Sequence, residues 1–428
     1  MKLNNRQTIL VGLAFMSISA FWQVYDGIIP LILKNTFAIN NTVSGVVMAL
    51  DNVLALFLLP IFGSLSDRTH TGIGRRMPFI LVGTAAASVA VIVIPLSDRI
   101  YSFPLFLVGL GVALLAMSSY RSPAVALMPD VTPKPLRSKG NAIINLMGAV
   151  GGILMLLAIK VMVPKGDHPD YLPLFILLAL FMVICVLLLF FTVNEPRAAA
   201  EMQRQSAAMG LTEEEETAQP DGKTRLPAEV FRSLCFLLAS IFLWFMGYNA
   251  VTTAFSKYAE HMWGMQGGDY ALVLMVAQAA AIVAFIPVGI IAGRIGRKRT
   301  ILLGICMLAA AFGGGALFSN HFSWLLFVFF TLAGVGWAFI NVNSYPMVVE
   351  MSRGADVGRY TGYYYAFSMA AQIITPILSG ALLDVSYRLL FPYGMFFAAL
   401  SFVTMLFVRH GDNRPERRRG IEAFDVDD

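Results

Sequence analysis

The chain has 428 residues, of which 57% are hydrophobic and 13% are charged, and its formal net charge is +5. A typical soluble domain carries about 25% charged residues, so the composition excludes an ordinary soluble protein and indicates a membrane protein. The excess of Lys and Arg lies in short segments between apolar stretches, so we do not interpret it as a nucleic-acid-binding surface.

Apolar stretches long enough to cross a membrane recur along the whole chain. A transmembrane helix needs about 20 mostly apolar residues. Twelve such stretches begin near Thr8, Thr42, Pro78, Phe103, Asn141, Tyr171, Glu229, Asp269, Thr300, Ser323, Thr361 and Arg388. We therefore predict an all-α membrane protein with twelve transmembrane helices, with boundaries good to about four residues.

A basic hairpin occurs twice, as GSLSDRTHTGIGRRMPFI at 63–80 and as GIIAGRIGRKRTIL at 289–302. A constant offset of 222 (296 − 74 = 222) relates Gly74 to Gly296, Arg75 to Arg297, Arg137 to Arg359, Gly140 to Gly362 and Trp22 to Trp244. The repeat predicts the major facilitator fold, with six-helix bundles at 1–193 and 229–408, a cytoplasmic linker at 194–228 and a cytoplasmic tail at 409–428.

The distribution of basic residues predicts the orientation of the helices. Roughly 24 of the 31 Lys and Arg residues lie at the termini or in alternate loops. Short cytoplasmic loops retain such residues, so both termini are expected in the cytoplasm. The first apolar run lacks a small-residue cleavage site and is expected to remain as the first helix. We expect a multi-pass protein of the bacterial plasma (inner) membrane.

No pattern in the sequence indicates an enzyme. The three cysteines lie far apart, no CxxC pair is present, and the five histidines lie in loops or at segment ends. There is no GxxxxGK[ST] sequence for binding ATP phosphates. We therefore expect no metal, no cofactor and no catalytic residues.

Charged residues inside apolar stretches are the first candidates for function, because a charge at the centre of a membrane helix costs about 2.5 to 3.5 kcal/mol. Asp26 lies in the first stretch, Asp51 in the second, and Arg121 in the fourth. A carboxyl group removed from water holds its proton at higher pH, so the two acids are candidate proton carriers. Arg121 is the only Lys or Arg that we place well inside a bundle, where it can pair with either acid or hold substrate hydroxyls.

Aromatic and amide side chains recur at spacings that place them on one helix face. Sugars present apolar CH faces and many hydroxyl groups, which suit aromatic rings flanked by amides and charges. The candidate substrate-binding residues are Trp22, Tyr25, Arg121, Trp244, Tyr248, Asn249, Gln278, Trp337, Asn341, Tyr345, Tyr364 and Gln372.

Acidic and basic residues at helix ends are candidates for a cytoplasmic gate. The set consists of Asp67, Arg68, Arg75, Arg76, Asp130, Arg137, Glu350 and Arg359. When the cytoplasmic side is shut, Asp130 can pair with Arg137, Glu350 with Arg359, and Asp67 with the arginines of the hairpin. Surface ion pairs contribute about 0 to 1 kcal/mol each, so they would tune the balance between inward-open and outward-open states. The same charges also serve to set topology.

GSLSDR followed by GRRMPFI, after Pro60, resembles the signature of the sucrose transporter family, and PAVALMPD resembles the end of its fourth helix. The likeness implies a major facilitator fold and proton-coupled uptake of a disaccharide or glucoside. The family's Arg in that fourth helix falls on Val125 here. In the more distant glycoside-pentoside-hexuronide symporters, an acidic residue used with sodium would fall on Leu59, which disfavours sodium coupling. Lithium or sodium use through Asp26 and Asp51 together stays open as an alternative.

The expected function is therefore proton-coupled sugar symport by alternating access, in a monomer that contacts the lipid bilayer and no nucleic acid. A proton-coupled drug or small-molecule antiporter is one alternative, although the fifth stretch, NLMGAVGGILML, lacks the Gly-Pro element of such exporters. Its glycines instead indicate close helix packing. A non-transporting membrane sensor is the other alternative.

Overall fold

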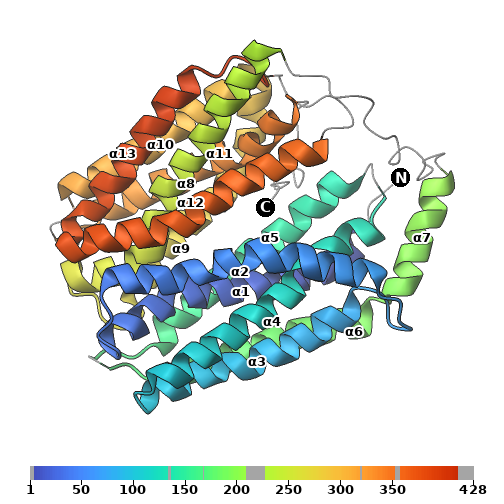
Figure 1. Ribbon diagram of the computed structural model, residues 1–428, viewed down its shortest axis with the longest axis horizontal. Helices are drawn as coiled ribbons and strands as arrows, with labels where there is room; N and C mark the ends of the chain where they lie inside the picture. Colours follow the sequence, from blue (N-terminus) through green and yellow to red (C-terminus); the bar gives the residue numbers. More distant parts are fainter. Residues whose placement is uncertain are drawn as a thin grey trace. The chain divides into compact units, whose positions relative to one another are not determined.

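The structure is a computed structural model. It describes residues 4–133, 136–166, 168–208, 227–318, 321–351 and 357–412. Within these ranges the regular secondary structure is entirely helical (Figure 1).

The helices follow the apolar stretches of the sequence. They are α1 (Asn5–Asn35), α2 (Asn41–Arg68), α3 (Met77–Arg99), α4 (Phe103–Val131), α5 (Arg137–Met162), α6 (Leu172–Thr192), α7 (Glu195–Ala208), α8 (Ala228–Trp263), α9 (Asp269–Ile295), α10 (Arg297–Phe318), α11 (Leu325–Val349), α12 (Val357–Val385), the short 3-10 helix η4 (Tyr387–Leu389) and α13 (Leu390–Leu406). Twelve helical segments in the described ranges are long and apolar enough to cross a membrane. The predicted twelve-helix membrane fold is confirmed.

Contacts divide the chain into two compact units. Unit 1 comprises Met1–Ile39, Leu50–Leu211 and Met265–Met275, and unit 2 comprises Asn40–Ala49, Thr212–Gly264 and Val276–Asp428. Most of α2 therefore belongs to unit 1 but its first residues belong to unit 2, and the start of α9 belongs to unit 1. The units differ at these two helix ends from the domain ranges predicted by the repeat.

Polar contacts explain where these two helix ends pack. In unit 2, the carboxylate of Asp384 accepts hydrogen bonds from the backbone N–H groups of Asn41 (2.8 Å) and Thr42 (2.9 Å), which caps the first turn of α2. In unit 1, Asp269 at the start of α9 forms an ion pair with Lys160 near the end of α5. Both contacts lie about a helix length from the basic hairpins, at the opposite helix ends.

Unit 1 is built on close contact between α1 and α5. A methyl group added at Gly151 would lie 2.2 Å from the carbonyl oxygen of Met16, so the two backbones touch at this point. On the other side, α3 packs against α4 and α6. The close approach predicted from the glycines of the fifth stretch is present.

Unit 2 is built in the same way from α8 and α10 to α13. The helix α10 packs against α11 and α13, and α8 packs against α12 and α13. Gly304 of α10 faces Gly336 of α11, where an added methyl group would lie 2.7 Å from the Gly336 carbonyl oxygen. Buried aliphatic and aromatic side chains around Val288 and Phe339 fill the space between α9 and α11.

The predicted linker begins with a helix. Its described part, α7, packs against α4 and runs across the direction of the other unit 1 helices (Figure 1). Residues 209–226 of the linker and 413–428 of the tail lie outside the described residues.

Candidate functional site

The structure brings the three intramembrane charges of unit 1 into one neighbourhood. Asp26 on α1, Asp51 on α2 and Arg121 on α4 are each half-buried. The charge of Asp51 acts on Asp26, and the charge of Arg121 acts on Asp51. Among the described residues none of the three forms a salt bridge within 4.0 Å, so no ion pair fixes one of these charges to another.

An aromatic group borders this charge cluster. The guanidinium carbon of Arg121 lies 5.9 Å from the centroid of the Trp22 ring. Trp22 in turn meets Tyr25 edge to face, with ring centroids 5.4 Å apart. The indole N–H of Trp22 is buried and has no hydrogen-bond partner among the described residues. A buried donor without a partner requires an explanation, and the acceptor atom of a bound water or ligand is one.

The predicted substrate residues of unit 2 form two groups. Tyr248 of α8 stacks on Trp337 of α11, with ring centroids 3.8 Å apart and planes 7° from parallel. The amide nitrogen of Asn249, next to Tyr248, is buried without a partner among the described residues. The second group is at Tyr345. Its ring centroid lies 5.5 Å from that of Tyr364, and its hydroxyl group shares a 3.0 Å hydrogen bond with the hydroxyl group of Thr361. Eight residues of α11 separate the two groups, or about 12 Å of helix.

The remaining predicted residues of unit 2 differ in accessibility. Trp244 is only 1% exposed, so its ring belongs to the core of the unit in this structure. Gln278, Asn341 and Gln372 are half-buried, and the side-chain amide of Gln372 donates to the Ser368 carbonyl oxygen at 3.4 Å. Exposure therefore favours these amides over Trp244 as ligand contacts.

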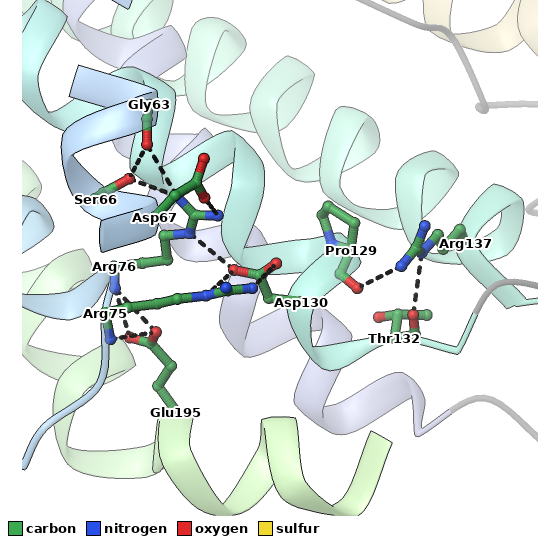
Figure 2. Close-up of polar contacts among 10 residues, drawn as sticks. All are labelled: Gly63, Ser66, Asp67, Arg75, Arg76, Pro129, Asp130, Thr132, Arg137 and Glu195. Carbon is green, nitrogen blue, oxygen red and sulfur yellow. Dashed lines mark hydrogen bonds and ion pairs between the residues drawn. The ribbon is translucent and has the colours of Figure 1, made fainter. Parts of the chain in front are cut away.

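The basic hairpin of unit 1 folds around one carboxylate (Figure 2). The carboxylate of Asp130, at the end of α4, forms ion pairs with the guanidinium groups of Arg75 (2.7 Å) and Arg76 (2.8 Å). Arg76 also contacts Asp67, at the end of α2, and the hydroxyl group of Ser66. Burial acts to lower the pKa of Arg76, but hydrogen bonds and charge from Asp130 and Asp67 outweigh it and raise that pKa above its usual value. Arg76 therefore remains a cation although it is only 5% exposed.

Two of the expected gate pairs are not formed in this structure. Arg137 donates to the carbonyl oxygens of Thr132 (3.3 Å) and Pro129 (3.2 Å), at the end of α4, because Asp130 is already occupied by the hairpin arginines (Figure 2). In unit 2, Glu350 forms its ion pair with Arg297.

The other two predicted gate residues have different surroundings. Arg359 lies one turn before Tyr363 and donates to its hydroxyl group at 2.7 Å. Arg68 is exposed at the end of α2.

Glu195, which was not among the predicted site residues, completes the network of unit 1. Its carboxylate accepts backbone N–H groups from Arg75 (2.8 Å), Arg76 (2.9 Å) and Met77 (2.8 Å). These groups begin α3 and have no partner within that helix. Gly74 has a φ angle of +117°, and a methyl group there would lie 2.2 Å from a Glu195 oxygen. Glycine is therefore required where the first turn of α7 meets the hairpin.

The second repeat contains a similar cap. Asp412, just after the last helix of unit 2, accepts the backbone N–H of Lys298 at 2.9 Å. Gly296, the repeat partner of Gly74, has a φ angle of +91° and lies against the same carboxylate. In each unit a carboxylate that follows the sixth long helix therefore caps the helix that follows the basic hairpin. An acid shortly after the last apolar stretch of each half was the available sequence signal.

The expectation that Arg121 is the only base inside a bundle is wrong, because a lysine also lies inside unit 2. Lys257 of α8 is 4% exposed, and its ammonium group lies 3.3 Å from the hydroxyl oxygen of Ser44. The sequence prediction overlooked it because it lies near the end of an apolar stretch. In the structure α8 continues to Trp263, which places Lys257 inside the helix.

Comparison with known proteins places these features in a family. Residues 11–262 and 237–425 match the sequence profile of the Major Facilitator Superfamily. The sucrose transport proteins SUC3 of Arabidopsis thaliana and SUT3 of Oryza sativa subsp. indica are 30% and 28% identical to this chain over 138 residues. Each match covers 28% of this chain, and 23% and 27% of the respective relative. The match thus spans about a quarter of the length of these curated relatives.

Solved structures share the fold at low sequence identity. The inward-open xylose transporter XylE from E. coli has a TM-score of 0.67 and 13% identity, with 93% of this chain and 94% of that chain covered. A POT family transporter in complex with 5-aminolevulinic acid has a TM-score of 0.71 and 11% identity, with 94% and 95% covered. These likenesses show that the chain shares the fold of these two structures.

Proposed function

We propose a function for this chain from the premise that it belongs to the Major Facilitator Superfamily and is a multi-pass membrane transporter. It carries a disaccharide or glucoside together with a proton by alternating access. The observation that supports this most directly is the position of Arg121. Its guanidinium group lies beside the Trp22 ring and acts electrostatically on the Asp51 carboxylate. One cation thus lies beside an aromatic ring and interacts electrostatically with a titratable acid.

The coupling that we propose is a competition for Asp51. When Asp51 is ionised, it attracts Arg121. When it takes up a proton, that attraction ends and the guanidinium donors are free to hold substrate hydroxyl groups. Asp26 interacts with Asp51, and two neighbouring carboxylates disfavour each other's charge. The pair therefore shares the binding of a proton, and Asp51 is the member that communicates with Arg121.

Three observations support a sugar as the substrate. The indole N–H of Trp22 lacks a partner among the described residues and can donate to a hydroxyl group. Tyr248 and Trp337 supply a flat aromatic surface in unit 2, and aromatic faces suit the CH faces of sugars. The named relatives are sucrose transport proteins.

The basic-hairpin networks have a mechanical role in this proposal. The contacts of Asp130 and Glu195 lie within unit 1, and the pair of Arg297 with Glu350 lies within unit 2. Each network therefore keeps the helix ends of its own unit together while the transporter changes state. We further propose that these ends and both termini face the cytoplasm, because basic loops are retained there.

The test is the internal pH of sealed liposomes that contain the purified protein, with sucrose, maltose, other glucosides and several lipophilic cations added one at a time. Internal acidification upon addition of one sugar would support proton symport and identify the substrate. Silence with every sugar, combined with a proton flux driven by a lipophilic cation, would replace the proposal with drug antiport. Binding without any flux would indicate a sensor.

A further inference from the structure

Tyr120 directly precedes Arg121 and joins three helices of unit 1. Its side chain is fully buried, at 0% exposure. Its hydroxyl group donates to the carbonyl oxygen of Ala14 on α1 at 2.9 Å and contacts the hydroxyl group of Ser17, which donates to the same carbonyl at 2.7 Å. This polar contact fixes the height of α4 against α1, that is, the position of α4 along the axis of α1.

On its other sides, α4 is held by close glycine contacts. A methyl group added at Gly83 of α3 would lie 2.6 Å from the Tyr120 Cβ atom, and one added at Gly63 of α2 would lie 2.9 Å from the hydroxyl oxygen of Ser122. The residues immediately before and after Arg121 are therefore each packed against a neighbouring helix. Little room remains for α4 to slide or rotate at this level.

The contact between Arg121 and Trp22 is sensitive to such movement. At 5.9 Å the guanidinium carbon is near the outer limit of about 6 Å for attraction by an aromatic ring. A helix rises about 1.5 Å per residue, so a shift of α4 by less than one residue would remove the contact. Trp22 lies on α1, the same helix that receives the Tyr120 hydroxyl group.

We propose that Tyr120 is a positioning residue, which sets the height of α4 on α1 so that Arg121 lies over Trp22. Neither Tyr120 nor Ser17 touches the substrate in this account. They act through Arg121, so their removal changes substrate affinity and leaves the movement of the empty carrier intact. This inference rests on the proposed role of Arg121 in binding substrate.

Transport kinetics give the first test, with Tyr120→Phe and the milder Ser17→Ala, which removes one partner of the same contact. We expect KM to rise about three-fold to ten-fold with little change in kcat, because one hydrogen bond that aligns the binding group is lost. Gly83→Ala, which pushes α3 away from Tyr120, should have the same effect. Ser88→Ala is the matched control for the serine, since its hydroxyl group is buried without a partner among the described residues. Gly111→Ala is the control for the glycine, since nothing lies within 4 Å of an added methyl group there.

A second test needs no transported substrate. Trp22 is made the sole tryptophan by replacing the other four with phenylalanine, and its fluorescence emission is recorded with Arg121→Gln as the reference for a lost cation. Tyr120→Phe and Gly83→Ala should each move the emission part of the way to that reference, and Ser88→Ala and Gly111→Ala should not. Unchanged emission and unchanged KM in Tyr120→Phe would overturn the proposal. If no sugar is transported, the proposed function fails while this fluorescence test still decides the role of Tyr120.

Discussion

Removing the carboxylate of Glu195 should loosen the start of α3. In Glu195→Ala, the N–H groups of Arg76 and Met77 lose their acceptor in a place where both residues are buried. A buried donor without a partner costs about 1 to 3 kcal/mol, so two of them cost about 2 to 6 kcal/mol. Water that enters the space left by the side chain reduces this cost, and we expect a loss of about 2 to 4 kcal/mol.

The assay combines thermal unfolding of the purified protein with hydrogen exchange of the peptide that covers 74–80. Glu195→Ala should lower the unfolding midpoint and accelerate exchange at the first amides of α3. Glu201→Ala is the matched control, because Glu201 is exposed on the same helix and bonds only to Gln205 in the described structure. Equal unfolding midpoints and equal exchange in the two variants would refute the capping role of Glu195.

Three further predictions follow from the same region and from the far end of α3. Gly74→Ala should lose about 1 to 3 kcal/mol of stability, because the residue has a φ angle of +117°, whereas Gly72→Ala, with open space around it, should unfold at the wild-type midpoint. Asp130→Asn leaves two arginines without their shared carboxylate, so a trypsin time course should show faster cleavage at the hairpin; wild-type kinetics would exclude this network as the restraint. Hydrogen bonding from Arg99 lowers the pKa of Asp170, and a depressed carboxyl pKa contributes stability above the unfolded-state value that is lost as the pH falls through the folded-state value. Asp170→Asn should therefore lower the unfolding midpoint at pH about 7 and not at pH about 2, and a difference of the same size at both values would contradict that linkage.

The twelve helices were predictable because membrane insertion depends on local composition. A spanning helix satisfies its own backbone groups and faces lipid with apolar side chains, so each apolar stretch carries its own signal. The fold of the basic hairpin was partly predictable for a similar reason. Asp67 and Arg76 lie close in sequence and pair in the structure, whereas Arg75 pairs with Asp130.

Partners that lie far apart in sequence were less predictable. Glu195 caps residues about 120 positions earlier, and its surroundings in the sequence are those of a polar linker. The pairing of Asp130 with Arg137 was expected because the two are neighbours in the chain, but the neighbouring helix α3 presents its own arginines to the same carboxylate. Tertiary packing therefore determines which arginine pairs with Asp130, and no local sequence pattern predicts the outcome.

The indole N–H of Trp22, which has no partner in the described part of the chain, illustrates the same limit. The sequence indicates that a tryptophan and an aspartate share the face of one helix. That Arg121 reaches this tryptophan depends on the height of α4, which side-chain packing sets.

Substrate-driven proton uptake in Asp51→Asn is the measurement that tests the account most directly. The variant is reconstituted in liposomes beside the wild type, Asp26→Asn, and Glu201→Gln as a control that removes an exposed negative charge outside the membrane helices. Asp51→Asn should fail to acidify the interior, because its amide cannot bind a proton. It should still exchange labelled sugar across the membrane, because no ionised carboxylate at this position attracts Arg121 away from the substrate. Sugar-driven acidification in Asp51→Asn at the wild-type rate would show that the proton does not compete with Arg121 for this group.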